Sequence, residues 1–379
     1  MKKMLMLATT AAMIEQFNKN NILILKEMGY EVHVAGNWKE GNPISDERLE
    51  QFKVWLAEHH GKWFHIPATR EPYDLKNNYV AYREVLGLIK EYEYEFIHCH
   101  TPIGSVIGRI AAHKTKTPII YTAHGFHFYD GAPLVNWLIY YPVEKLLSYW
   151  TDILILINQE DYNRAKIKFH SRRTEYVAGV GVDVGKFSGQ TVDREEKRKE
   201  LGLDPNDCAF LSVGELIPRK NHLIVIQALS DMRNAKVKYF ICGKGPFEKK
   251  YHEMIEKYNL HGQVFLLGFR DDIVDICKAV DLFVFPSLQE GLPLALMEAM
   301  ASGLPVICSD IRGNRDLIDD VDWLFDLNNI DNLCKKLEHF LRIGEDELRF
   351  VAMRNINKME EYSKDKVRDK MRIIYNTLI

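Results

Sequence analysis

The chain has 379 residues, of which 46% are hydrophobic and 27% are charged, and its formal net charge is -3. This composition is ordinary for globular proteins, and it excludes a disordered chain or a membrane bundle. The small net charge gives no global signal for nucleic-acid binding, so any anion site must be local. The length exceeds what one hydrophobic core usually serves and predicts two domains.

The N-terminal segment imitates a short secretion signal, because Lys2 and Lys3 precede an apolar run that reaches Met13. Thr9 and Thr10 interrupt that run, and an amphipathic helix over 15–28 is expected to follow. A strand, loop, helix and second strand explain the segment better than a cleaved leader. No apolar run reaches the roughly 20 residues that span a bilayer. We therefore expect a cytoplasmic protein that can rest on the inner face of the cell membrane.

Predicted strands and helices alternate along most of the chain, which is typical of parallel α/β layers. The first series has strands at Met4–Ala8, Glu31–Ala35, Phe96–Cys99, Pro118–Thr122 and Ile153–Leu156, and helices that include Ile103–His113 and Leu134–Ser148. The second series has strands at Ala209–Val213, Lys238–Cys242, Gln263–Leu267, Leu282–Phe285 and Pro305–Cys308. Its helices lie near Asn221–Asp231, Phe247–Lys257, Asp272–Lys278, Leu294–Ser302 and Asp331–Leu341.

A mostly polar stretch from Phe187 to Arg194 separates the two series. It predicts one domain over 1–188 and a second over 189–362, with an amphipathic helix over 363–379 that packs back on the first. Open parallel sheets bind ligands at the carboxyl ends of their strands. Two such sheets facing each other predict a ligand cleft between the domains.

The richest segment carries two glutamates, Glu290 in the loop after a buried strand and Glu298 about one turn into the next helix. Pro293 suits the first turn of that helix. Both carboxylates can point into one crevice, beside the free backbone N–H groups near Leu294, where a helix favours phosphate. The pattern predicts a nucleotide-sugar site. The alternative is two solvated glutamates.

Glu290 and Glu298 form a Glu-x7-Glu pair that runs into Ala-Met-Ala-Ser-Gly-Leu-Pro-Val over 299–306. The segment resembles the donor motif of glycosyltransferase family 4, whose members have the GT-B fold and retain anomeric configuration. The resemblance extends over nearly the whole chain, and more widely to bacterial exopolysaccharide and capsule transferases. It implies an α/β protein with two Rossmann-like domains facing a cleft, Glu290 on sugar hydroxyls and Glu298 on the donor ribose.

A basic loop follows the first strand of the second series, where Gly214 permits a tight turn and Arg219 and Lys220 follow. Arginine can grip a phosphate with two hydrogen bonds, whereas lysine acts as a point charge. The loop resembles the family's Gly-x-Leu-x-x-x-Lys pattern, which implies Lys220 on the diphosphate. Glu215 stands where many members carry a basic residue, so we assign the arginine role to Arg219. These cations can stabilise a leaving nucleotide without a metal.

Three histidines lie in or directly after predicted strands of the first series. His124 follows a predicted strand and precedes a glycine, which resembles the family's His-Gly loop and implies a catalytic role. By itself, a lone histidine is as often structural. His98 and His100 share one strand face, but no third ligand has convincing spacing for a metal. We expect them to line the cleft or to pack.

The predicted site has three parts, with no metal and no cofactor. The catalytic residues are Glu290, His124, Lys220 and Arg219; the donor-binding residues are Glu298, Gly291, Leu292, Leu294, Gly214, Phe269 and Arg270; the acceptor-side residues are Thr9, Thr10, His100 and Thr101. Many family members carry paired glycines where this chain has Thr9 and Thr10. The aromatic-rich segment 137–147 fits a half-buried core helix, or a contact with a polyprenyl acceptor or the membrane.

The resemblance implies a retaining, metal-independent transfer from a nucleotide sugar, a UDP-hexose or UDP-N-acetylhexosamine, to a glycan or a polyprenyl-diphosphate-linked saccharide. Two alternatives stay open, because fold alone does not fix function. A UDP-sugar epimerase on the same fold would need no acceptor, and product analysis would distinguish it. An inactive scaffold subunit is favoured by the glycine-free first loop, but the glutamate pair and the basic loop argue against it.

Overall fold

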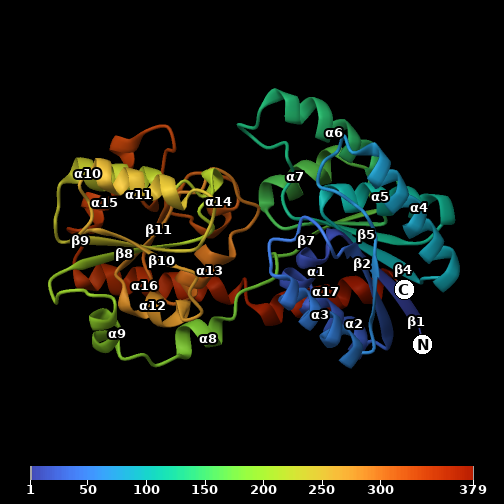
Figure 1. Ribbon diagram of the computed structural model, residues 1–379, viewed down its shortest axis with the longest axis horizontal. Coiled ribbons are helices and arrows are strands. Elements are labelled where there is room, and N and C mark those ends of the chain that lie inside the picture. The colour runs from blue at the N-terminus through green and yellow to red at the C-terminus, as the bar shows by residue number, and fades with distance from the viewer. Residues whose placement is uncertain (1, 379) are drawn as a thin grey trace. The chain divides into compact units, whose positions relative to one another are not determined.

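The computed structural model describes residues 2–378. The chain divides into two compact units, unit 1 with Met1–Val180 and Asp365–Ile379, and unit 2 with Gly181–Lys364 (Figure 1). The sequence placed the boundary at 188/189, eight residues later than the structure does. The reason is helix α8 (Val184–Gly189), which packs against helices α13 (Leu294–Ala301) and α16 (Glu345–Glu360) of unit 2.

Unit 1 is built on a parallel sheet of seven strands in the order β3-β2-β1-β4-β5-β6-β7. The strands are β1 (Lys2–Thr10), β2 (Tyr30–Asn37), β3 (Lys62–His65), β4 (Phe96–His100), β5 (Ile119–Ala123), β6 (Ile153–Leu156) and β7 (Arg173–Tyr176). Side chains along β1 alternate between two hydrophobic clusters, with Met6 in one and Leu7 in the other. Helices therefore cover both faces of the sheet, as buried parallel strands require.

The helices of unit 1 are α1 (Ala11–Phe17), α2 (Lys19–Glu27), α3 (Asp46–Glu58), α4 (Leu75–Tyr92), α5 (Pro102–Thr115), α6 (Leu134–Ser148), α7 (Gln159–Lys168) and α17 (Lys364–Leu378). The single helix predicted over 15–28 was wrong. Two helices meet at Asn18, whose backbone φ of -125° and ψ of 4° lie outside helical values. The first of them begins at Ala11, directly after β1.

Unit 2 has a parallel sheet of six strands in the order β10-β9-β8-β11-β12-β13. The strands are β8 (Cys208–Val213), β9 (Val237–Cys242), β10 (Val264–Gly268), β11 (Leu282–Phe285), β12 (Val306–Ser309) and β13 (Leu324–Phe325). Its further helices are α9 (Arg194–Glu200), α10 (Leu223–Met232), α11 (Glu248–Lys257), α12 (Ile273–Ala279), α14 (Asn314–Leu317) and α15 (Ile330–Phe340), with 3-10 turns at Pro218–Lys220 and Val321–Trp323.

The chain passes between the units twice, and the two passages run side by side. Val182 accepts a hydrogen bond from the backbone of Lys364 at 2.9 Å and donates one to Tyr362 at 2.9 Å. Gly181 has a φ of 71°, and a Cβ there would lie 2.7 Å from the Cα of Lys364. Only glycine fits such a left-handed and crowded position. After this pairing, α17 packs in the core of unit 1 through Met371 and its neighbours.

Between residues 2 and 378, no helix combines the length and the apolar character needed to cross a membrane.

Candidate active site

The loops after β8 and β11 meet at the carboxyl edge of the unit 2 sheet. The Nζ of Lys220 donates to Oε1 of Glu290 at 2.8 Å, and a guanidinium N–H of Arg219 donates to the same oxygen at 3.0 Å. The backbone N–H of Leu288 donates to the carbonyl of Arg219 at 2.8 Å. The predicted catalytic residues of this unit therefore form one cluster, held by backbone as well as side-chain bonds.

In the cluster two cations bond to one carboxylate, and two of its three side chains are largely buried. The side chains of Lys220 and Glu290 are only 14% and 10% exposed, whereas that of Arg219 is 43% exposed. The lysine also lies over the ring of Phe285, with Nζ 5.0 Å from its centroid. A Cβ on Gly214 would sit 3.3 Å from the lysine side chain. Glycine at 214 thus leaves room for the lysine, and the net positive charge suits an anionic group.

Glu298 projects from the helix that begins after this loop. Its carboxylate makes no hydrogen bond or ion pair with any of residues 2–378. Burial raises the pKa of Glu298 to about 7, although Lys186 and Lys364 lower it in part. A partly buried carboxyl with free acceptor oxygens is suited to a ligand with hydroxyl donors. Helix α13 begins at Leu294 without a side-chain cap, which leaves its first N–H groups for a ligand.

Two glycines allow the loops around the cluster to touch through their backbones. Gly243, after β9, has a φ of 156°, and a Cβ there would lie 1.9 Å from the carbonyl oxygen of Gly214. Gly313, after β12, has a φ of 83°, and a Cβ there would lie 2.3 Å from the carbonyl oxygen of Gly291. The carbonyls of the predicted donor residues Gly214 and Gly291 therefore lie against Gly243 and Gly313, where no side chain fits.

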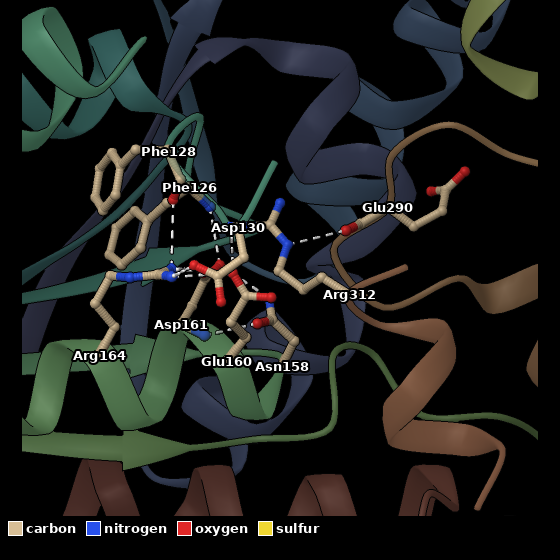
Figure 2. A network of polar contacts seen from close by, with 9 residues as sticks. All are labelled: Phe126, Phe128, Asp130, Asn158, Glu160, Asp161, Arg164, Glu290 and Arg312. Atoms are coloured by element: carbon tan, nitrogen blue, oxygen red, sulfur yellow. Dashed lines mark hydrogen bonds and ion pairs between the residues drawn. The ribbon is translucent and has the colours of Figure 1, made fainter. Parts of the chain in front are cut away.

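Arg312 is a functional candidate that sequence reasoning missed. It is 5% exposed, and its Nε donates to the backbone carbonyl of Glu290 at 3.3 Å (Figure 2). A signal was available, because the Arg312-Gly313 pair follows β12 at the same sheet edge as Glu290. The guanidinium holds the backbone of Glu290, the residue that was predicted to be catalytic.

Two further predicted donor residues follow β10. The side chain of Phe269 is 65% exposed and lies at the surface. Arg270 donates to Asp272 at 2.7 Å and to Glu200 at 2.7 Å, so its guanidinium belongs to an ion-pair network. Those bonds hold the pKa of Asp272 below its usual range. Backbone groups of this loop, rather than the Arg270 charge, are the better candidates for ligand contact.

Three histidines of unit 1 lie together, His98 and His100 in β4 and His124 directly after β5. Nδ1 of His100 is 3.2 Å from Nε2 of His124, and His98 bonds Thr122 at 2.8 Å and Tyr375 at 2.9 Å. Burial lowers the pKa of His124 to about 4 and that of His98 to about 3. The rings are therefore neutral near pH 7. Among residues 2–378, no group of three metal-binding side chains was found.

Two of the threonines that were predicted on the acceptor side form a hydrogen bond with each other. The hydroxyls of Thr9 and Thr101 lie 2.7 Å apart, and the hydroxyl of Thr9 accepts a hydrogen bond from the backbone of Gly104 at 3.1 Å. Thr101 has a φ of 65°, a strained value for a β-branched residue. Thr9 and Thr10 were predicted on the acceptor side, but both side chains are buried. Thr9 lies near the end of β1 and connects that strand to Thr101 and Gly104, which follow β4.

Helix α7 anchors the loop that carries His124. Asp161 accepts hydrogen bonds from the backbone of Phe126 and the side chain of Asn158, both at 2.9 Å (Figure 2). Arg164 bridges Asp130 at 2.7 Å and Glu160 at 3.1 Å. Sequence reasoning missed this support. The Asn158–Asp161 spacing at a helix start was its signal.

Two Rossmann-like units, each with its own parallel sheet and one with a carboxylate and cation cluster before a helix, are typical of a GT-B glycosyltransferase. The family model for glycosyl transferases group 1 matches residues 193–355, and the glycosyl transferase 4-like model matches residues 3–158. The chain belongs to this glycosyltransferase family, as predicted.

Relatives and solved structures agree with that assignment. The chain is 34% identical over 380 residues to the "Putative glycosyltransferase EpsD" of Bacillus subtilis, covering 95% of this chain and 96% of the relative. It is 31% identical over 327 residues to the UDP-Gal:alpha-D-GlcNAc-diphosphoundecaprenol alpha-1,3-galactosyltransferase of Escherichia coli, covering 84% and 81%. The crystal structure of Anabaena HepE has the same fold, with a TM-score of 0.78, 20% identity and full coverage of both chains.

Proposed function

We propose that the protein is a retaining, metal-independent glycosyltransferase of bacterial polysaccharide synthesis. It transfers a sugar from a UDP-sugar to a saccharide carried on a lipid diphosphate. The observation that carries the proposal is the bond of both Lys220 and Arg219 to one oxygen of Glu290 at the start of α13. The relative that uses UDP-galactose and a diphosphoundecaprenol-linked acceptor supports both substrate classes.

Each part of a UDP-sugar finds a chemical counterpart in unit 2. The diphosphate binds Lys220, Arg219 and the N–H groups at the start of α13, where the helix dipole favours negative charge. As the cations turn to the diphosphate, Glu290 accepts hydrogen bonds from sugar hydroxyls. The free carboxylate of Glu298 accepts hydrogen bonds from the ribose.

The reaction exchanges one bond at the anomeric carbon. The acceptor oxygen bonds to that carbon, while the bond from the carbon to the β-phosphate oxygen breaks on the same face. The acceptor proton passes to the departing β-phosphate, so the chain needs no nucleophile of its own. Lys220 and Arg219 stabilise the charge that develops on the leaving UDP, which is the role a divalent cation has in other transferases.

The acceptor side is assigned to unit 1. The neutral pair of His100 and His124 can donate and accept hydrogen bonds without a change of charge. Helix α6 exposes apolar side chains, among them Leu134 and Leu138, which are 81% and 76% exposed. Such a surface favours contact with a bilayer, where a lipid-linked acceptor resides. We place the enzyme in the cytoplasm, at the inner face of the membrane.

The test is a screen of UDP-, GDP- and ADP-sugars for nucleotide release, with GlcNAc-diphosphoundecaprenol as the acceptor and with or without EDTA. We expect release from a UDP-sugar that EDTA does not change, and a product whose anomeric configuration matches the donor. Lys220→Ala and Glu290→Ala should each reduce kcat/KM by about 100-fold at an unchanged Tm. Lys249→Ala, which alters a lysine that is 90% exposed, is the matched control. Near-normal turnover in either site variant would contradict the proposal.

A further inference from the structure

An apolar groove runs between α4 and α5 on the outer surface of unit 1. Its volume is about 760 Å³, within the range of roughly 300–1,000 Å³ found for small-molecule sites. Helix α4 contributes Leu75, Tyr79 and Tyr82, and α5 contributes Ile103, Val106 and Ile110. The two helices pack side by side (Figure 1).

The groove leaves apolar side chains open to water. Leu75 is 74% exposed, Tyr79 is 59% exposed and Ile110 is 37% exposed. Scattered apolar residues are normal on a surface, but a contiguous apolar hollow usually marks a binding site. Its lining offers few polar groups, so a peptide could not satisfy its backbone there. A hydrocarbon chain has no such need.

The position of the groove connects it to the acceptor side. Ile103 lies in the first turn of α5, two residues after Thr101, where β4 ends. Both α4 and α5 run back from the carboxyl edge of the sheet, because α4 leads into β4 and α5 leads into β5, which is parallel to β4. The lining residues of α4 lie in its N-terminal half, and those of α5 extend from its first turn to Ile110. The groove therefore opens at the sheet edge that carries His100 and His124.

One positively charged side chain lies at the groove. Lys76 is the one charged residue in the lining, and it makes no ion pair with any of residues 2–378. An apolar channel beside an unpaired cation suits an amphiphile with a hydrocarbon chain and an anionic head. We propose that this groove binds the hydrocarbon chain of the acceptor's lipid diphosphate, with Lys76 beside the diphosphate. The inference rests on the proposed function for its choice of a lipid-linked acceptor.

The experiment measures binding to the full chain without any transfer step. The probes are farnesyl diphosphate and inorganic pyrophosphate, each titrated with saturating UDP so that the cluster around Lys220 is occupied. We expect the protein to bind farnesyl diphosphate at least about tenfold more tightly than pyrophosphate, because only the former buries a chain. Ile110→Asp should remove that difference and leave pyrophosphate binding unchanged, whereas Ile110→Leu should keep it.

Val54→Asp is the matched control. Val54 is 59% exposed and lies on α3, which packs on the other face of the sheet, so its replacement should change neither affinity. Equal affinities of the unaltered protein for the two probes would overturn the inference. So would equal farnesyl diphosphate binding by the unaltered and Ile110→Asp proteins at matching Tm. Turnover of UDP-sugars is scored separately, so a failed transferase assay contradicts the proposed function and not the groove.

Discussion

At the scale of single residues, the proposed donor-binding residue Glu298 carries a cost in stability. Burial raises its pKa from the ordinary 4.5 to about 7 in the folded protein. Between those values the folded chain holds a proton that the unfolded chain has lost. Stability therefore falls as pH rises through this window, and the cost is complete above pH 7. We attribute the presence of a buried carboxyl group at this position to a ligand that binds its charged form.

Glu298→Gln should make the protein more stable at pH 8.5 than the unaltered chain, because the amide has no charge to bury. Each pKa unit corresponds to about 1.4 kcal/mol, so the gain is at most a few kcal/mol. At pH 4.5 or below the gain should vanish, since both chains are then largely neutral at this position. Thermal unfolding at the two pH values measures the effect. An equal change in Tm at both pH values would show that the charge of Glu298 does not contribute to the stability difference.

The site residues show what a single sequence could and could not predict. Glu290 and the basic loop were predicted because each follows a strongly apolar strand, and Glu298 because it lies about one turn into the next helix. The bond between Lys220 and Glu290 was not predicted, because a sequence pattern does not say which opposite charges pair. Arg312 and Asp161 were missed because their partners are backbone groups of other loops.

At the scale of elements, the loops at the sheet edge of unit 2 depend on close backbone contact. Gly313→Ala should weaken UDP binding by about tenfold or more and lower stability by roughly 1–3 kcal/mol. The reasons are its φ of 83° and the 2.3 Å that would separate a new Cβ from the Gly291 carbonyl. Gly189→Ala is the control, since a Cβ there meets nothing within 4 Å. Calorimetric titration with UDP and thermal unfolding measure both effects. Unchanged UDP affinity in Gly313→Ala would show that the loop does not shape the donor site.

Each predicted strand agrees with the structure to within two residues at either end. The three strands that were not predicted, β3, β7 and β13, each lie at an edge of a sheet. Charged residues occur in two of them, Lys62 in β3 and Arg173 in β7. A central parallel strand is buried on both faces and is almost wholly apolar, whereas an edge strand needs no continuous apolar run. The break at Asn18 was missed because the apolar period continues across it.

At the scale of the whole molecule, unit 1 depends on a helix from the far end of the chain. Tyr375 is fully buried, and its hydroxyl bonds His98 at 2.9 Å. Tyr375→Ala should destabilise unit 1 by about 3–5 kcal/mol, as other large-to-small core changes do. Hydrogen exchange followed by mass spectrometry should then show loss of protection in unit 1 and none in unit 2. Ile373→Ala, at a position 61% exposed on the same helix, should have little effect. Equal loss of protection from hydrogen exchange in both units would contradict the assignment of α17 to unit 1.

The most direct measurement for the whole account is a crystal structure of the protein with UDP. We predict that the diphosphate lies on Lys220 and Arg219 at the start of α13, that the ribose reaches Glu298, and that Glu290 has released at least one of its two cations. UDP bound elsewhere, with both cations still on Glu290, would contradict the account.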